Sequence, residues 1–115
     1  MISEDSLYAA YVKERQGLLC LWESYGFIAY KIVEHECFLS DMFIRKEDRK
    51  SGKCRELLGS LEEIAKRAEC KIITANIHLW DVNANKTLAA AQACGFEVKG
   101  ANNGVILIVK ELKGA

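Results

Sequence analysis

The stretch Arg49-Lys50-Ser51-Gly52-Lys53-Cys54 (RKSGKC, residues 49–54) joins two segments of different periodicity. Before it, Cys37–Ile44 is an apolar, strand-like run. After it, Lys53–Glu69 repeats apolar residues at steps of three and four, which is the pattern of one helical face. A strand that turns through glycine into a helix leaves the first helical amides without carbonyl partners and aimed in one direction. The stretch therefore predicts an anion site.

Positive charge surrounds this turn. Glycine at position 52 allows the backbone to approach a ligand closely. Only two acids, Glu47 and Asp48, offset the cations of the loop, which are Arg45, Lys46, Arg49, Lys50, Lys53 and Arg55. A pyrophosphate would suit this chemistry. The alternative left open is an ordinary turn within a solvated basic loop.

The composition bounds the class of protein. The chain has 115 residues, half of them apolar, which suits a single domain spanning residues 1–115. Lys plus Arg equals Asp plus Glu, so no overall field attracts nucleic acid or an anionic membrane. No apolar stretch approaches the roughly 20 residues that span a bilayer, and Met1–Ala10 does not resemble a signal peptide, so we expect a cytoplasmic protein. No two cysteines form a C-x-x-C pair, which predicts free thiols and no metal site (Cys20, Cys37, Cys54, Cys70, Cys94).

The N-terminal half predicts a helix and then an antiparallel meander. Ser3 followed by two acids signals a helix start, and we expect the helix to run to about Arg15 before Gln16-Gly17 ends it. Its inward side chains are expected to be Leu7, Tyr8, Tyr11 and Val12. From Leu18 to Ile44 short apolar runs alternate with turn residues, and residues 34–36 form a polar hairpin tip.

The C-terminal half completes an α/β (α+β) fold with a mixed, mostly antiparallel sheet. Lys71–Ile77 is a β-branched strand that follows the long helix, which favours parallel pairing with the strand before it. A shorter helix is expected from about Val82 to Ala93, with Gly95 as its left-handed stop. Two closing strands are expected on either side of a turn at residues 101–103.

This order of elements resembles the GNAT superfamily of acyl-CoA-dependent N-acyltransferases. The family's loop reads Gln or Arg, x, x, Gly, x, Gly or Ala, and Arg49, Gly52 and Cys54 occupy its three defining positions. The resemblance covers residues from about 18 to 112, with Gly95-Phe96 as a second anchor. It implies that acetyl-CoA (coenzyme A) is the cofactor, with its pyrophosphate bound by the loop amides of residues 49–54.

The resemblance also implies where the rest of the cofactor lies. The central parallel strands are expected to splay apart, so that the pantetheine arm pairs with free backbone groups of Met42, Phe43 and Ile44. The family often uses an asparagine at the start of the second helix to hold the pantetheine. Asn83 and Asn85 stand there, and the alternative is that they only cap the helix.

Four departures from the family pattern bear on activity. Cys54 replaces a Gly or Ala, and its thiol at a helix N-terminus is expected to be acidic and reactive. Lys46 stands where the family often has proline. Ala91 stands where many members have the tyrosine that protonates the departing thiolate. The N-terminus holds room for one helix and one strand, so the acceptor side is expected to be open.

Acyl transfer to an amine needs a proton acceptor and a donor at the splay. Asp41 is the candidate base, although it also suits a simple ion pair with a nearby cation. His78, at the end of the parallel strand, suits a proton relay but also an ordinary surface position, and His35 at a hairpin tip is the weaker candidate. Trp22 and Trp80 suit either a pocket wall or a core.

The resemblance and these residues together predict an acetyl-CoA-dependent N-acetyltransferase that transfers an acetyl group to a primary amine by direct attack. The amine is a small molecule, a protein lysine or a protein N-terminus. One alternative is a non-catalytic coenzyme A binder or protein-interaction module on the same fold, and another is a small αβ interaction protein without a cofactor. Apolar edge strands also predict a homodimer.

Overall fold

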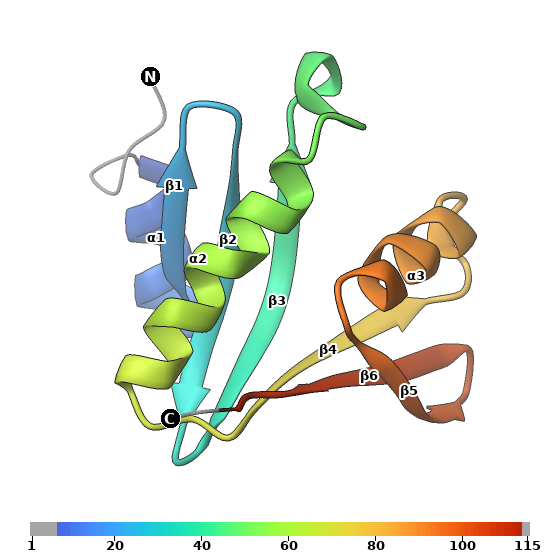
Figure 1. Cartoon of the computed structure of the whole chain (residues 1–115). Helices are drawn as coiled ribbons and strands as arrows, with labels where there is room; N and C mark the ends of the chain where they lie inside the picture. Colours follow the sequence, from blue (N-terminus) through green and yellow to red (C-terminus); the bar gives the residue numbers. More distant parts are fainter. Residues whose placement is uncertain (1–6, 114–115) are drawn as a thin grey trace.

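The computed structural model describes residues 7–113, so the helix-start signal at Ser3 lies outside the described residues. A six-stranded mixed sheet in the order β1-β2-β3-β4-β6-β5 carries three helices (Figure 1). The elements are α1 (Leu7–Gln16), β1 (Leu19–Glu23), β2 (Gly26–Val33), β3 (Glu36–Ile44), the short 3-10 helix η1 (Lys46–Asp48), α2 (Lys53–Arg67), β4 (Ile72–His78), α3 (Ala84–Ala93), β5 (Glu97–Asn102) and β6 (Val105–Glu111). The α/β fold class is confirmed. None of the described helices is both long and apolar enough to cross a membrane.

The antiparallel pairings follow the sequence pattern closely. Strands β1, β2 and β3 form the expected meander, and its second hairpin turns at Glu34 with φ of 55°. The closing hairpin turns slightly later than expected, because Asn102 still pairs with Val105. Asn103 and Gly104 make the turn, with φ of 52° and 78°. Two successive positive φ angles suit the right-handed twist of a tight hairpin, and Asn-Gly adopts them at low cost.

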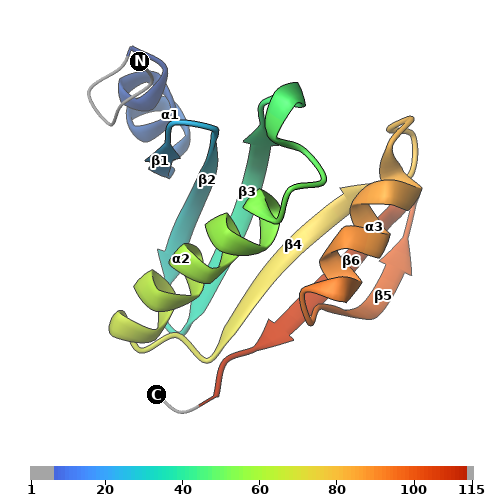
Figure 2. The same ribbon diagram turned by 45° about the horizontal axis from the view of Figure 1, so that its top comes forward.

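The parallel strands β3 and β4 pair only over part of their length. Their register runs from Glu36 opposite Ile72 to Leu39 opposite Ala75, although β3 continues to Ile44. The two strands then diverge, which is plain in both ribbon views (Figures 1 and 2). We call the space between the diverging ends the splay. The expected parallel pair is confirmed, and it opens toward the loop at residues 45–52.

A bulge in β3 lies where the parallel pairing ends. Tyr30 of β2 pairs with Leu39, whereas Ala29 pairs with Asp41, so Ser40 is an extra residue in β3. A bulge bends its strand and increases the local twist, which turns the end of β3 away from β4. It also resets the alternation of side chains, so that Leu39 and Ile44 share one face while Asp41 and Phe43 share the other.

The main core lies on one face of the sheet, beneath α2 and α3. The long helix buries the apolar face that its periodicity predicts, except that Ala68 is exposed at its C-terminal end. The buried side chains of this face come from four strands, both helices and three connecting segments: Tyr25, Ile28, Tyr30, Cys37, Ile44, Leu57, Leu58, Leu61, Ala65, Cys70, Ile73, Ala75, Ile77, Ala84, Phe96 and Ile108. Gly95 stops α3 with φ of 97°, as expected.

Helix α1 lies on the opposite face and packs differently from the sequence prediction. Leu7 is 91% exposed and Tyr11 is 54% exposed, so the predicted inward face is wrong for these two. Tyr8 is 42% exposed, but its ring packs edge-on against Trp22 and Phe27 of the sheet, as its predicted inward position requires. The side chain of Val12 lies outside the described part of the structure. Among the side chains of α1 that the structure describes, Ala9 is the buried one, because this short helix contacts the sheet mainly at β1.

Candidate functional site

The loop between β3 and α2 has the backbone of an anion site. Lys50 and Gly52 adopt left-handed φ angles of 65° and 83°, and α2 starts directly afterwards. The first helical hydrogen bond runs from the Glu56 amide to the Gly52 carbonyl at 3.1 Å. The amides of residues 53–55 therefore precede the helical ladder and carry the positive end of the helix dipole.

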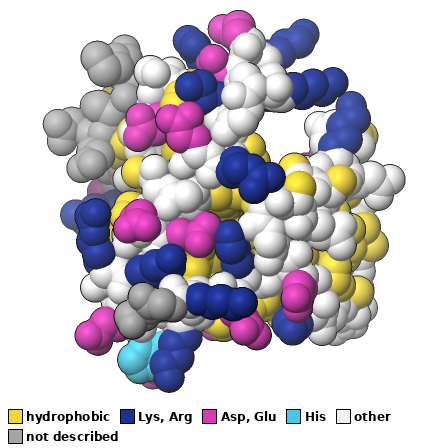
Figure 3. Space-filling view, viewed as in Figure 1, with side chains coloured by type: hydrophobic (Ala, Val, Ile, Leu, Met, Phe, Trp, Pro, Cys, Tyr) yellow, Lys and Arg dark blue, Asp and Glu magenta, His cyan; other side chains and the backbone are white. Residues whose placement is uncertain are grey.

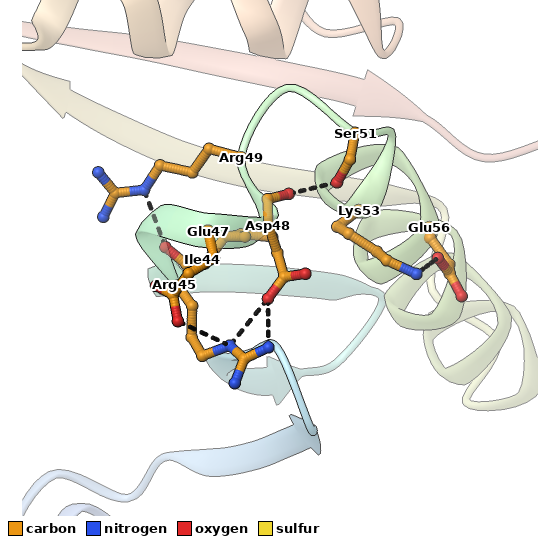
Figure 4. Close-up of polar contacts among 8 residues, drawn as sticks. All are labelled: Ile44, Arg45, Glu47, Asp48, Arg49, Ser51, Lys53 and Glu56. Atoms are coloured by element: carbon orange, nitrogen blue, oxygen red, sulfur yellow. Dashed lines mark hydrogen bonds and ion pairs between the residues drawn. The ribbon is translucent and has the colours of Figure 1, made fainter.

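Contacts within the loop hold this conformation (Figure 4). Arg45 makes an ion pair with Asp48 at 2.6 Å, and its Nε donates a second bond to the same carboxylate at 2.8 Å. Ser51 Oγ donates to the Asp48 carbonyl. Because Asp48 is neutralised by Arg45 at the outer side of the turn, its charge opposes an anion at the helix start less than the sequence suggests.

The remaining cations divide into held and unpaired side chains. Lys53 pairs with Glu56 at 3.4 Å, and Arg55 Nη2 donates to the Ala93 carbonyl at the end of α3 at 3.1 Å. Lys46 and Lys50 make no ion pair with any residue in 7–113. Dark-blue Lys and Arg side chains flank the notch at the top of the molecule (Figure 3). Positive charge therefore borders the entrance to the splay.

Two backbone groups that face the splay already have side-chain partners. The Arg45 amide donates to the Tyr25 carbonyl next to β2. Because backbone groups alternate in direction along a strand, the N–H and C=O groups of Phe43 point toward β2, and those of Met42 and Ile44 point toward β4. The Met42 amide donates to Asp41 Oδ1 at 2.9 Å. The Ile44 carbonyl accepts from Arg49 Nε at 2.9 Å. The expectation of free groups from Met42 to Ile44 is wrong for these two, because neighbouring side chains satisfy them.

Asp41 and His78 come from the two strands that border the splay. Asp41 is exposed on the α1 side of β3 and forms no ion pair with a described cation, so the ion-pair alternative does not hold among residues 7–113. His78 is exposed at the end of β4, where its ring stacks against Trp80 at 4.5 Å between centroids. Trp80 is 69% exposed, whereas Trp22 is half-buried, so the two tryptophans differ in role.

The start of α3 places both predicted asparagines in the open. Asn83 holds the N-cap position, but its side chain makes no capping bond. Asp81 Oδ1 instead accepts from the Asn83 amide at 2.8 Å, and Asn85 is exposed in the first turn. The simple capping interpretation is therefore wrong for Asn83. Asp81 is a polar residue of this site that was not predicted, although the spacing Asp-x-Asn before a helix is typical of such a turn.

Cys54 is not the acidic thiol that its position suggests. It is half-buried at the main core, and its side chain is hydrogen-bonded with that of Cys94 at the end of α3. Burial, followed by the neighbouring Cys94, raises the pKa of the Cys54 thiol, and the nearby Arg55 charge lowers it less. Desolvation therefore outweighs the attraction of the thiolate to Arg55. The sequence offered no signal for this pairing, because the two cysteines come from distant segments.

His35 lies far from the splay, at the opposite end of the sheet. A surface hollow of about 590 Å³ there is lined by side chains of both charges together with Val33, His35, Phe38 and Ile72. The His35 ring contacts the Glu69 carbonyl through Nδ1 at 3.2 Å. This position excludes His35 from chemistry at the loop.

Comparisons with known proteins agree with this geometry. Residues 3–96 match the sequence profile of the Acetyltransferase (GNAT) family, so the chain belongs to the GNAT acetyltransferase family. A comparison with curated proteins finds no match.

Solved structures with the same fold include three acetyltransferases. The PaiA N-acetyltransferase of Thermoplasma acidophilum, in complex with coenzyme A, has a TM-score of 0.74 and 19% identity, over 95% of this chain and 71% of that one. The ribosomal-protein-S18-alanine N-acetyltransferase of Escherichia coli has a TM-score of 0.70 and 14% identity, over 96% of this chain and 79% of that one. A GNAT family acetyltransferase of Elizabethkingia anophelis with acetyl-CoA bound has a TM-score of 0.66 and 16% identity, over 78% of this chain and 70% of that one. At these identities the likeness shows the fold.

Proposed function

We propose that this protein binds acetyl-CoA and transfers the acetyl group to a primary amine by direct attack. The observation that carries the proposal is the position of the unpaired amides at the start of α2, directly beside the opening between β3 and β4. An anionic group and an extended arm can therefore be held side by side. The solved structures with coenzyme A or acetyl-CoA bound support this choice of ligand.

The loop has the shape that a pyrophosphate requires. A Cβ at Gly52 would meet no atom within 4 Å, so the space in front of the helix start is open. We assign pyrophosphate binding to the amides of residues 50–55, with Arg49, Lys50 and Lys53 supplying charge. Asn83 and Asn85 are assigned to the pantetheine because both side chains are exposed at the α3 side of the splay.

The residues of β3 supply the reaction's polar groups. Acetyl-CoA brings an activated thioester, whose carbonyl oxygen gains charge during attack. The Met42 amide is the donor aimed into the splay, and it can serve that oxygen only after the exposed Asp41 carboxylate rotates away. The released carboxylate is then placed to take a proton from the incoming ammonium, and His78 is a second candidate for proton relay.

The overall change balances without another reactant. The amine nitrogen bonds to the acetyl carbon, and the bond from that carbon to sulfur breaks. Of the three protons on the ammonium, one passes through Asp41 to solvent before attack, one leaves the nitrogen to water or His78 as the amide forms, and one stays on the amide. Ala91 supplies no proton, so the sulfur must receive its own from water or His78.

One observation favours the non-catalytic alternative, a coenzyme A-binding module. In the described structure the Met42 amide, which acyl transfer requires as a donor, is hydrogen-bonded to the Asp41 carboxylate. Ala91, at the position of the family's tyrosine, packs against the main core. A protein that only binds coenzyme A would need neither group.

Two successive measurements test the proposal. Coenzyme A at about 100 times its dissociation constant should raise stability by about 2.7 kcal/mol, seen as a higher thermal midpoint. Free thiol should then appear from acetyl-CoA in the presence of a primary amine. An unchanged midpoint at millimolar coenzyme A contradicts the cofactor, whereas stabilisation without thiol release from any amine supports the binding module.

A further inference from the structure

A continuous group of aromatic side chains covers the sheet face opposite α2. Tyr8 of α1 lies 5.5 Å from Phe27 of β2 between ring centroids, and Trp22 of β1 lies 4.8 Å from the same ring. Phe43 of β3 continues the series at 6.2 Å from Phe27. We call these four residues the aromatic floor. Because Phe43 lies in the diverging part of β3, the floor reaches the edge of the splay.

The floor is partly exposed both at Phe43, beside the splay, and at Tyr8, at its α1 end. Phe43 is 46% exposed and Tyr8 is 42% exposed. Rings that served only the core would be covered more completely, and contiguous exposed aromatic surface is typical of binding sites. The main core on the other face already holds the large buried side chains, so the floor is an additional apolar surface.

The charges around the floor are arranged asymmetrically. Asp41 lies two residues before Phe43 on the same face, and its charge is one cause, after burial, of the raised pKa of Tyr8. The carboxylate therefore lies on the diverging part of β3, beside the splay, and also within electrostatic reach of the Tyr8 ring. On the loop side of Phe43, the Arg49 guanidinium carbon lies 5.5 Å from the ring centroid. A ligand on the floor meets a negative group beside the splay and a positive group beside the loop.

We propose that the acceptor is a primary amine carried on an apolar arm, with the amine at Asp41 and the arm on the aromatic floor. This assignment rests on the proposed acetyl transfer. An ammonium is drawn to a carboxylate and to ring faces, which places the reacting nitrogen at the splay. An arm with hydroxyl groups would lose water against the rings without replacement partners, and an arm with a second cation would approach Arg49.

Thiol release at fixed acetyl-CoA from 2-phenylethylamine, ethanolamine and spermidine tests the assignment. We expect kcat/KM for 2-phenylethylamine to exceed that of the other two by roughly tenfold or more, because its aromatic arm is removed from water when it lies on the rings. A preference for ethanolamine or spermidine overturns the assignment and leaves the proposed transfer intact. Thiol release from none of the three at any concentration overturns the assignment. Failure across further amines and peptide N-termini overturns the transfer itself.

Matched variants locate the arm. Phe27→Leu removes a ring from the middle of the floor without touching the loop, and Phe38→Leu removes an equally half-buried ring from the far end of the same sheet face. Phe27→Leu should lower kcat/KM for 2-phenylethylamine about tenfold while leaving the KM for acetyl-CoA unchanged. Phe38→Leu should change neither. Equal losses in both variants, or an equal loss for ethanolamine in Phe27→Leu, contradict the assignment. Coenzyme A-induced thermal shifts confirm that both variants are folded.

Discussion

Gly52 is needed in the loop for its backbone conformation and for the space before it. Its φ of 83° lies in the left-handed region, which costs other residues about 1–2 kcal/mol. No atom lies within 4 Å of a Cβ built there, so a side chain would project into the space assigned to the pyrophosphate. Gly17 offers an internal comparison, because it has φ of 68° and equally open space at the end of α1.

Gly52→Glu should abolish the thermal shift caused by coenzyme A, whereas Gly17→Glu should retain it. Both variants carry the same backbone strain and the same new charge, so both should lose about 1–2 kcal/mol of stability without ligand. Only the first places a carboxylate before the helix amides. Calorimetric titration with coenzyme A measures the difference. Equal affinities in the two variants would show that the loop does not hold the anion.

The Cys54 thiol should react slowly for a cysteine at a helix start. Because its pKa is raised, the thiolate fraction near pH 8 is smaller than that of an unperturbed thiol. Iodoacetamide labelling followed by mass spectrometry should therefore give a rate below that of a cysteine in an unfolded peptide. Cys94→Ser removes the neighbouring thiol and should raise the Cys54 rate, since Cys94 is the second cause of the shift. Faster labelling of Cys54 than of the peptide would contradict this.

At the level of elements, the close approach of β2 and β3 explains a second glycine. A Cβ at Gly26 would collide with the Phe43 carbonyl and would lie 3.0 Å from the Ile44 Cα. This contact lies at the end of β3 from which the loop departs. The position of the loop therefore depends on how closely β2 and β3 pair at this end.

Gly26→Ala should destabilise the protein by roughly 1–3 kcal/mol, because the strands must separate to admit the methyl group. Gly59→Ala is the matched control. Gly59 lies inside α2 with no atom within 4 Å of a Cβ, so alanine there should stabilise by about 0.5–1 kcal/mol. Urea unfolding measures both. Stabilisation of both variants would show that the hairpin is looser than described.

The helices and strands were predictable from the periodicity of apolar residues, but the side of each element that is buried was not always predictable. The apolar steps of α2 fix its buried side because the helix covers several strands. Helix α1 has a similar sequence signal, yet only Tyr8 of its three described large apolar side chains packs on the sheet, while Leu7 and Tyr11 stay exposed, because one short helix over a sheet edge buries a narrow strip. The Ser40 bulge was also missed. Its extra residue is visible only when β3 is aligned with its partner strand.

For the candidate site, local features were predictable and long-range pairings were not. The Gly52 turn and the parallel pair follow from short segments, and both are present. The contacts of Arg49 with the Ile44 carbonyl and of Cys54 with Cys94 depend on tertiary packing that no spacing reveals. The homodimer and the roles of Asp41 and His78 stay predictions.

For the molecule as a whole, the fully buried Cys37 thiol couples folding to alkaline pH. Burial, then Cys70 and Glu36, raises its pKa from 9.0 to about 12. Above pH 9 the unfolded chain loses this proton while the folded chain keeps it, so stability falls as pH rises toward 12. The slope from this group approaches about 1.4 kcal/mol per pH unit.

Urea unfolding of wild type and Cys37→Ala between pH 8 and 11 tests this coupling. The variant should be less stable at pH 8, because it loses buried sulfur, but its stability should decline less steeply. Tyrosine and lysine titrations contribute equally to both proteins and cancel in the difference. Parallel curves would show that the thiol has an ordinary pKa.

The short parallel seam between β3 and β4 divides the sheet into two halves, and this has a consequence for how the protein opens in time. The seam joins only residues 36–39 to residues 72–75, so β1-β2-β3 and β4-β6-β5 should fluctuate as separate units. Amide hydrogen exchange resolved by strand should show two distinct opening free energies in the free protein. A ligand touching both halves acts as the missing strand, so with coenzyme A bound the two values should converge.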